Sequence, residues 1–156
     1  MNSGQKAKGE VVRGALRASG KVCIRALGSS MWPWVRSGDV LVVAREAPSG
    51  MRRGHVAFYA RHGSLFAHRL VGKLRRGGEV LLVTHGDALP CGDAPVRVRE
   101  ILGRVVRIRR GNREIDLETW PRSALGWLLA HLSRFNRWTH PVARRLVRLL
   151  RLVRAA

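Results

Sequence analysis

The chain has 156 residues, of which 46% are hydrophobic, so it is long enough for one folded domain with a buried core and is too apolar to be a disordered chain. Its 30 Lys and Arg against 10 Asp and Glu give a net charge of +20, which attracts the phosphates of nucleic acid or lipid without deciding between them. The only two cysteines, Cys23 and Cys91, lack metal-ligand spacing and are too few for a disulfide framework. We therefore expect a reduced, cytoplasmic protein with no metal and no cofactor, although one bridge between the two cysteines stays an alternative.

Residues 1–20 are polar and glycine-rich, and we expect an N-terminal segment with a short helix at Glu10–Arg17. This segment lacks the apolar stretch of a signal peptide. No part of the chain approaches the roughly 20 apolar residues that cross a bilayer. The sequence therefore predicts neither export nor a transmembrane anchor.

Residues 21–118 contain short apolar runs separated by glycines and prolines, which is typical of β-strands joined by turns. The expected strands are Val40–Ala44, His55–Ala60, Ser64–Val71, Glu79–Thr84, Leu102–Arg109 and Arg113–Leu117. Glycines at 63, 77, 78 and 111 indicate the turns between them. Strands this close together predict a mainly-β domain, built as a coiled antiparallel sheet or a partly open barrel.

Residues 119–156 follow a helical period. In Ala143–Arg154, arginines lie on one face and leucines on the other, and Ser123–Trp138 interleaves Leu, Trp and Phe with Arg. Basic amphipathic helices of this kind suit peripheral contact with an anionic membrane through 123–154, at the inner face of the cell membrane. The alternative is a helical hairpin that packs on the sheet or on a partner with its arginines in solvent.

Three constellations carry side chains suited to catalysis. Ser30 lies in a turn bounded by Gly28 and Pro33, where backbone N–H groups could face an oxyanion. His68 is placed by strand alternation on the face of its strand that also carries Phe66 and Leu70. Each has an ordinary structural explanation, since most turn serines bond locally and a buried histidine is more often a core residue than a base.

The third constellation is the loop at 85–93, which follows a strand and holds two of the ten acidic residues, Asp87 and Asp93. A loop aspartate can orient a histidine and stabilise its protonated form, and we expect Asx-turn structure to explain one of the two.

Together these stretches resemble the sequence boxes of type I signal peptidases, in the archaeal and endoplasmic-reticulum branch, and of the related self-cleaving repressors. The matching stretches cover about residues 24–109 and are Gly28–Pro33 with Gly38–Asp39, Arg53–Phe58, Ala67–Val71, His85–Asp93 and Leu102–Val106. The resemblance implies a serine endopeptidase with Ser30 as nucleophile, His68 as general base and Asp93 as the residue that orients it. Asp87 would support the site or exchange roles with Asp93.

The same resemblance implies that a precursor peptide or protein binds as an extended strand beside Gly28, Ser29, Met31 and Pro33. It also shows departures from the family. Gly28 replaces a serine whose hydroxyl gives the second oxyanion donor in much of the family, and His55 replaces an aspartate. The membrane anchor of the relatives has no counterpart in these boxes.

These departures leave two other functions open. One is a catalytically inactive, peptide- or partner-binding protein with the same fold. The other is nucleic-acid binding, suggested by the charge but not favoured, because no helix-turn-helix or aromatic RNA-binding signature is present. The sequence does not identify the substrate or an oligomeric state.

Overall fold

The computed structural model describes residues 3–118; the amphipathic segment expected at 119–156 lies outside the described residues. The domain consists of one N-terminal helix and a single coiled antiparallel sheet that does not close into a barrel, so the mainly-β prediction is confirmed. The elements are α1 (Ser3–Ser19), β1 (Lys21–Arg25), β2 (Val40–Ala44), β3 (Val56–Arg61), β4 (Ser64–Arg76), β5 (Glu79–His85), β6 (Val96–Arg97), the short 3₁₀ helix η1 (Val98–Glu100), β7 (Ile101–Arg110) and β8 (Arg113–Asp116).

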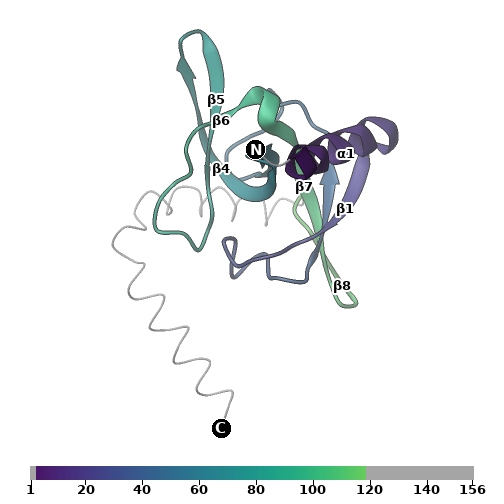
Figure 1. The fold of residues 1–156 in the computed structure, drawn as a ribbon. Coiled ribbons are helices and arrows are strands. Elements are labelled where there is room, and N and C mark those ends of the chain that lie inside the picture. Colours follow the sequence, from purple (N-terminus) through teal and green to yellow (C-terminus); the bar gives the residue numbers. More distant parts are fainter. Residues whose placement is uncertain (1–2, 119–156) are drawn as a thin grey trace.

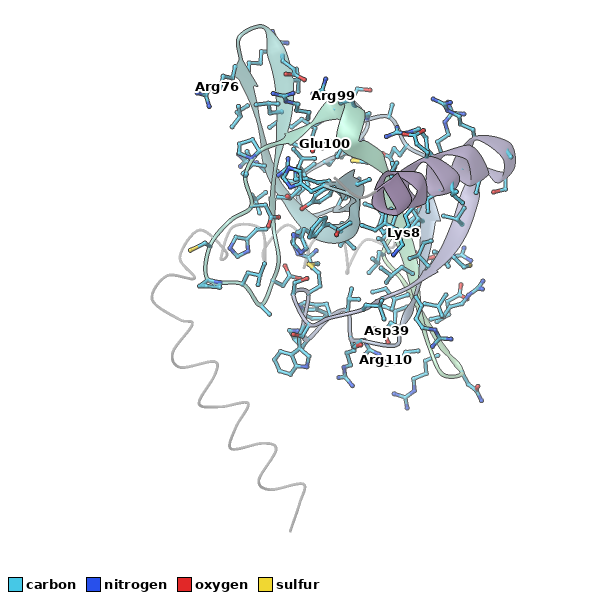
Figure 2. All side chains as sticks on the ribbon, viewed as in Figure 1. Lys8, Asp39, Arg76, Arg99, Glu100 and Arg110 are labelled. Atoms are coloured by element: carbon cyan, nitrogen blue, oxygen red, sulfur yellow. The ribbon has the colours of Figure 1, made fainter. Side chains whose placement is uncertain are left out.

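The strands lie in the order β1-β2-β7-β3-β4-β5-β6, and β8 pairs with β7. Figure 1 shows the sheet curling on itself, with the β4–β5 hairpin projecting at one end and the β7–β8 hairpin at the other. Figure 2 shows the ion pair of Asp39 with Arg110 near the β7–β8 hairpin, far from Arg76 in the β4–β5 hairpin. Because β1 ends this order, one of its edges is free of strand partners within residues 3–118.

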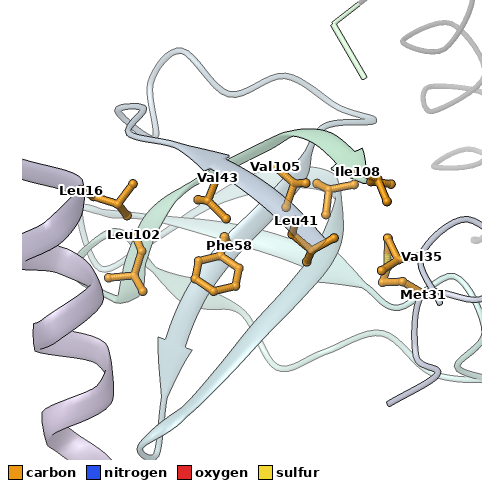
Figure 3. Packing of buried hydrophobic residues seen from close by; sticks show 10 residues of the cluster. Leu16, Met31, Val35, Leu41, Val43, Phe58, Leu102, Val105 and Ile108 are labelled. Atoms are coloured by element: carbon orange, nitrogen blue, oxygen red, sulfur yellow. The ribbon is translucent and has the colours of Figure 1, made fainter. Parts of the chain in front are cut away.

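Both faces of β3 are buried, and this divides the apolar interior into two clusters. Phe58 belongs to the larger cluster, while Ala57 and Tyr59 belong to the smaller one, as the alternation of side chains along a strand requires. Figure 3 shows the larger cluster extending from Leu16 on the helix, past Phe58, to the far end at Met31 and Val35. The coiled sheet thus places a turn segment and a helix at opposite ends of one core.

Helix α1 is longer than the short helix expected at Glu10–Arg17, and it belongs to the same core as the sheet. Leu16 is fully buried and Val12, one turn earlier, packs beside it. Gly9 allows the helix to approach β3, because a Cβ there would lie 2.9 Å from the Cβ of Ala60. The helix ends at Gly20, whose left-handed φ of +71° and N–H bond to the Leu16 carbonyl form a glycine cap.

The expected strands are present, with ends that differ by a few residues. β2 has the expected bounds, whereas β4 continues past Val71 to Arg76 as one side of the long hairpin with β5. Strands β1 and β6 were not expected: β1 has only two strongly apolar side chains that alternate with exposed ones, and β6 is two residues long.

The close packing of β7 against β2 requires the glycine at position 103. A Cβ at this position would lie 2.3 Å from the carbonyl oxygen of Ala44 on β2, so only glycine allows the two strands to lie this close. Its place in the Leu-Gly-Arg stretch is therefore required by the packing of the sheet.

Candidate active site

Ser30 lies in the turn that follows β1, held between the core and a neighbouring loop. The next residue, Met31, is buried and anchors the turn, together with Val35, at the end of the larger cluster. The Ser30 carbonyl accepts a hydrogen bond from the Ala88 N–H at 2.9 Å. These contacts fix the backbone on both sides of the Ser30 hydroxyl.

His68 lies on β4 directly opposite Ala57 of β3, on the face that carries Phe66. Its Nε2 lies 3.0 Å from the Ser30 Oγ, and its Nδ1 lies 2.6 Å from the Oδ2 of Asp93. His68 is buried, so the imidazole is held in one orientation with a partner at each nitrogen. The structure therefore brings together Ser30, His68 and Asp93 in the order expected from the sequence.

Asp93 is held by two further hydroxyl groups. The Thr84 hydroxyl donates to its Oδ2 at 2.7 Å and the Tyr59 hydroxyl donates to the same oxygen at 3.3 Å. The backbone adds a third restraint, because the Asp93 N–H donates to the Thr84 carbonyl at 3.0 Å. Burial raises the pKa of Asp93, but hydrogen bonds from His68, Thr84 and Tyr59 outweigh it, so the pKa is held below its usual value and the group is a carboxylate at neutral pH.

Asp87 does not take the place of Asp93. Both of its carboxylate oxygens accept hydrogen bonds from Arg69, at 2.8 and 2.6 Å, in a bidentate pair whose side chains are each 7% exposed. Arg69 also donates to the Gly54 carbonyl at 2.8 Å. Because Arg69 follows His68 on β4 and points to the opposite face, this pair ties the loop at 86–93 to the strand that carries the histidine. The exchange of roles between the two aspartates is thus corrected: Asp87 anchors the loop, and Asp93 contacts His68.

A groove of about 500 Å³ leads to the Ser30 hydroxyl. One wall is formed by 24–28, which continues the free edge of β1, and the other by 63–68, where β4 begins. Strand β5 pairs with β4 only from Arg69 onward, so this first part of β4 has its partner on the β3 side. The remaining lining residues are Lys8, Ser30, Met31, Val35, Leu41, Phe58 and Leu89. The groove thus combines two strand edges with a largely apolar floor.

Of the four residues expected to bind substrate, two line the groove and two do not. Gly28 and Met31 line the groove, while Ser29 and Pro33 are exposed and are not among its lining residues. Gly28 has a φ of +89°, in the left-handed region that favours glycine. A side chain at this position would therefore be strained by the backbone conformation.

Sequence reasoning missed the groups that hold Asp93. Thr84 comes directly before the His-Gly-Asp stretch and could have been suspected from that position. Tyr59 could not, because its approach to Asp93 depends on the pairing of β3 with β4. The strand β1, which forms one wall of the groove, was missed for the same reason: its partner is β2.

The structure also bears on the expectations for the cysteines, for metal binding and for membrane-spanning helices. Cys23 and Cys91 are both free and exposed. Among residues 3–118, no group of three or more His, Cys, Asp or Glu side chains could hold a metal ion. Within the same range, no helix is long and apolar enough to cross a membrane. The cytoplasmic location and the membrane contact of 123–154 stay predictions.

No family model matches the chain, and no curated protein matches it.

Proposed function

We propose that this chain is a serine endopeptidase that cleaves an extended segment of a precursor peptide or protein. The observation that carries the proposal is the continuous chain of contacts from the Ser30 Oγ through His68 to Asp93, at 3.0 and 2.6 Å. A serine hydroxyl bonded to an imidazole that is itself oriented by a carboxylate is the arrangement that activates a serine for acyl transfer.

In the proposed reaction, the Ser30 Oγ attacks the carbonyl carbon of the scissile peptide bond while His68 Nε2 takes the hydroxyl proton. The Asp93 carboxylate stabilises the imidazolium ion that forms. His68 then gives the proton to the leaving amine as the C–N bond breaks, which leaves an acyl ester on Ser30. A water molecule, deprotonated by His68, hydrolyses this ester and restores the free serine.

The groove supports an extended substrate. A peptide strand lying between 24–28 and 63–68 would have a strand edge on each side, and backbone hydrogen bonds to such edges recognise a peptide with little regard to its sequence. The apolar floor, with Met31, Phe58 and Leu89, would select among side chains that point into it.

The oxyanion would be stabilised by the Ser30 N–H, a backbone donor in the turn that carries the nucleophile. In much of the family that the sequence resembles, a serine hydroxyl two residues before the nucleophile is the second oxyanion donor. This chain has Gly28 at that position. Loss of one such donor costs about 10²–10³ in rate, so we expect slow turnover. This observation also favours the second candidate, a protein that binds peptides in the same groove without cleaving them.

A fluorophosphonate probe tests the proposal without knowledge of the substrate, because it forms a covalent adduct only with an activated serine. We expect a single adduct on Ser30, detected by peptide mass spectrometry. Ser30→Ala and His68→Ala should abolish the adduct, and Ser30→Ala should reduce cleavage of a peptide library by a factor on the order of 10⁶, or to background.

Ser29→Ala is the matched control, because it removes an exposed serine one residue away and should leave the labelling of Ser30 unchanged. Wild-type protein that forms no adduct and cleaves no peptide, yet binds peptides in a way that Phe58 or Leu89 substitutions weaken, would identify the non-catalytic binding function instead.

A further inference from the structure

Three hydrogen-bond donors converge on one oxygen of the Asp93 carboxylate. His68 Nδ1 lies at 2.6 Å from Oδ2, the Thr84 hydroxyl at 2.7 Å and the Tyr59 hydroxyl at 3.3 Å. Thr84 is fully buried and Tyr59 nearly so, which means that bulk water does not replace either hydroxyl. A buried oxygen with this many donors must share its electron density among them.

The directions of these bonds follow from what each group can do. The carboxylate can only accept, so the Thr84 and Tyr59 hydroxyl groups must be the donors. Tyr59 also lies 3.3 Å from His68 Nδ1, but that nitrogen carries the proton it donates to Asp93 and has no lone pair for the phenol. Burial raises the pKa of Tyr59 to about 12, so the phenol keeps its proton throughout the neutral range.

From this geometry we propose that Thr84 and Tyr59 are positioning residues that fix the Asp93 carboxylate and thereby set the pH at which His68 becomes a base. This inference rests on the proposed function, of which it describes the regulation by pH. Each hydroxyl withdraws electron density from Oδ2 and so weakens the stabilisation that Asp93 gives to protonated His68. The site therefore becomes active at a lower pH than it would with an unsupported aspartate.

Two other ionisable groups lie around this cluster. On β3, Arg61 lies near Asp93 and its guanidinium stands over the Tyr59 ring at 5.9 Å. On β5, His85 is buried beside the loop and interacts with both Asp93 and His68. Neither side chain is hydrogen-bonded to the Thr84 or Tyr59 hydroxyl within residues 3–118, so both groups stay in place in the variants.

The two hydroxyls should not be equal. The Thr84 bond is 0.6 Å shorter than the Tyr59 bond, given the distances of 2.7 and 3.3 Å, and charge-assisted hydrogen bonds weaken steeply with length. Thr84 is therefore expected to hold Asp93 more firmly than Tyr59 does.

The experiment measures kcat/KM against pH for Thr84→Val, Thr84→Ser and Tyr59→Phe, with the His68 imidazole titrated by NMR in the same full-length proteins. Thr84→Val keeps the side-chain volume and removes the hydroxyl. We expect it to move the midpoint of the acid limb, and the NMR midpoint, upward by about 0.5–1 pH unit. We also expect kcat/KM at the optimum to fall about tenfold while KM changes little.

Tyr59→Phe should move both midpoints in the same direction by a smaller amount. Thr84→Ser is the control, because it keeps the hydroxyl and loses a buried methyl group. It should retain the wild-type midpoint, whereas a merely structural role for Thr84 would make it at least as damaging as Thr84→Val.

Two results would overturn the inference: unchanged midpoints in Thr84→Val and Tyr59→Phe, or equal effects of Thr84→Val and Thr84→Ser. If Thr84→Val does not fold, Tyr59→Phe and Thr84→Ser still decide between the outcomes. The NMR titration needs no substrate, so the two proposals fail separately. Shifted midpoints without any cleavage would remove the protease function alone, and cleavage with unshifted midpoints would remove this inference alone.

Discussion

Gly28 lies two residues before the proposed nucleophile and combines a left-handed backbone with an open surrounding space. Its φ is +89°, and a Cβ built on it would meet no atom within 4 Å. Space therefore does not exclude a side chain at this position, but the backbone conformation does, because L-residues rarely adopt it. A serine hydroxyl cannot be restored here without moving the chain that leads into Ser30.

We predict that Gly28→Ser does not accelerate catalysis. The serine should lower the free energy of unfolding by about 1 kcal/mol through backbone strain, as measured by chemical denaturation. Gly28→Ala is the matched control, since it imposes the same strain without a hydroxyl. Faster turnover of Gly28→Ser than of wild type would show that the hydroxyl reaches the oxyanion and that this prediction is wrong.

At the scale of elements, the arrangement of the site depends on how β4 holds the loop at 86–93. Arg69 and Asp87 form the buried pair between them, and the Ala88 N–H bonds to the Ser30 carbonyl. Gly86 is part of the same contact, because a Cβ there would lie 2.8 Å from the Ser30 carbonyl oxygen. One loop therefore positions Asp93 and also restrains the turn that carries Ser30.

We predict that Asp87→Ala destabilises the protein by about 3–5 kcal/mol, because it leaves the Arg69 guanidinium buried without its partner. Thermal or chemical unfolding measures this loss. The double variant Arg69→Met with Asp87→Leu should recover most of the stability, since no unpaired charge remains. Glu114→Ala, which breaks exposed pairs with Arg107 and Arg109, is the control and should change stability too little to measure. A similar small effect of Asp87→Ala would show that the loop is held by other contacts.

At the scale of the whole molecule, two histidines with depressed pKa values link stability to pH. Burial lowers the pKa of His85, whose buried Nδ1 has no hydrogen-bond partner among the described residues 3–118. Burial and the neighbouring charge of Arg104 lower the pKa of His55, whose Nδ1 accepts the Arg52 N–H at 3.2 Å. Both are therefore neutral in the folded protein at a pH where the unfolded chain is already protonated.

The sign of the effect follows from proton binding. Below about pH 6.5, the ordinary value for histidine, the unfolded chain binds more protons than the folded one. We predict that the free energy of unfolding decreases as the pH falls from 7 to 5, and that the variant with His55→Gln and His85→Gln flattens this dependence. Urea denaturation at several pH values provides the measurement, and an equal slope in wild type and variant would contradict the assignment.

Much of the fold could be predicted from local patterns. The apolar run Val40–Ala44 is a strand with the expected bounds, and the glycines at 63, 77, 78 and 111 lie in turns with positive φ. These features depend on neighbouring residues only, since strand alternation and turn geometry are properties of a few consecutive positions. The same holds for the placement of Arg69 on the face of β4 opposite His68.

Longer-range pairing decided what the local patterns left open. Strand β1 exists because β2 lies beside it, and α1 joins the core because Gly9 and Leu16 meet the sheet. Neither partner can be identified from the five residues of the strand or from the polar helix. Amphipathic patterns show that a face is buried, and they do not show against what.

The candidate site shows the same division. By itself, the sequence determined which residue types were available: a serine in a constrained turn, a histidine on a strand and two aspartates in one loop. Only the tertiary structure decided that Asp93 meets His68 while Asp87 meets Arg69, and that Thr84 and Tyr59 converge on the carboxylate. The physical reason is strand pairing: β4 lies between β3 and β5, which brings Tyr59 and Thr84 to the same side chain, and the Asp93 N–H bonds to the Thr84 carbonyl at the end of β5.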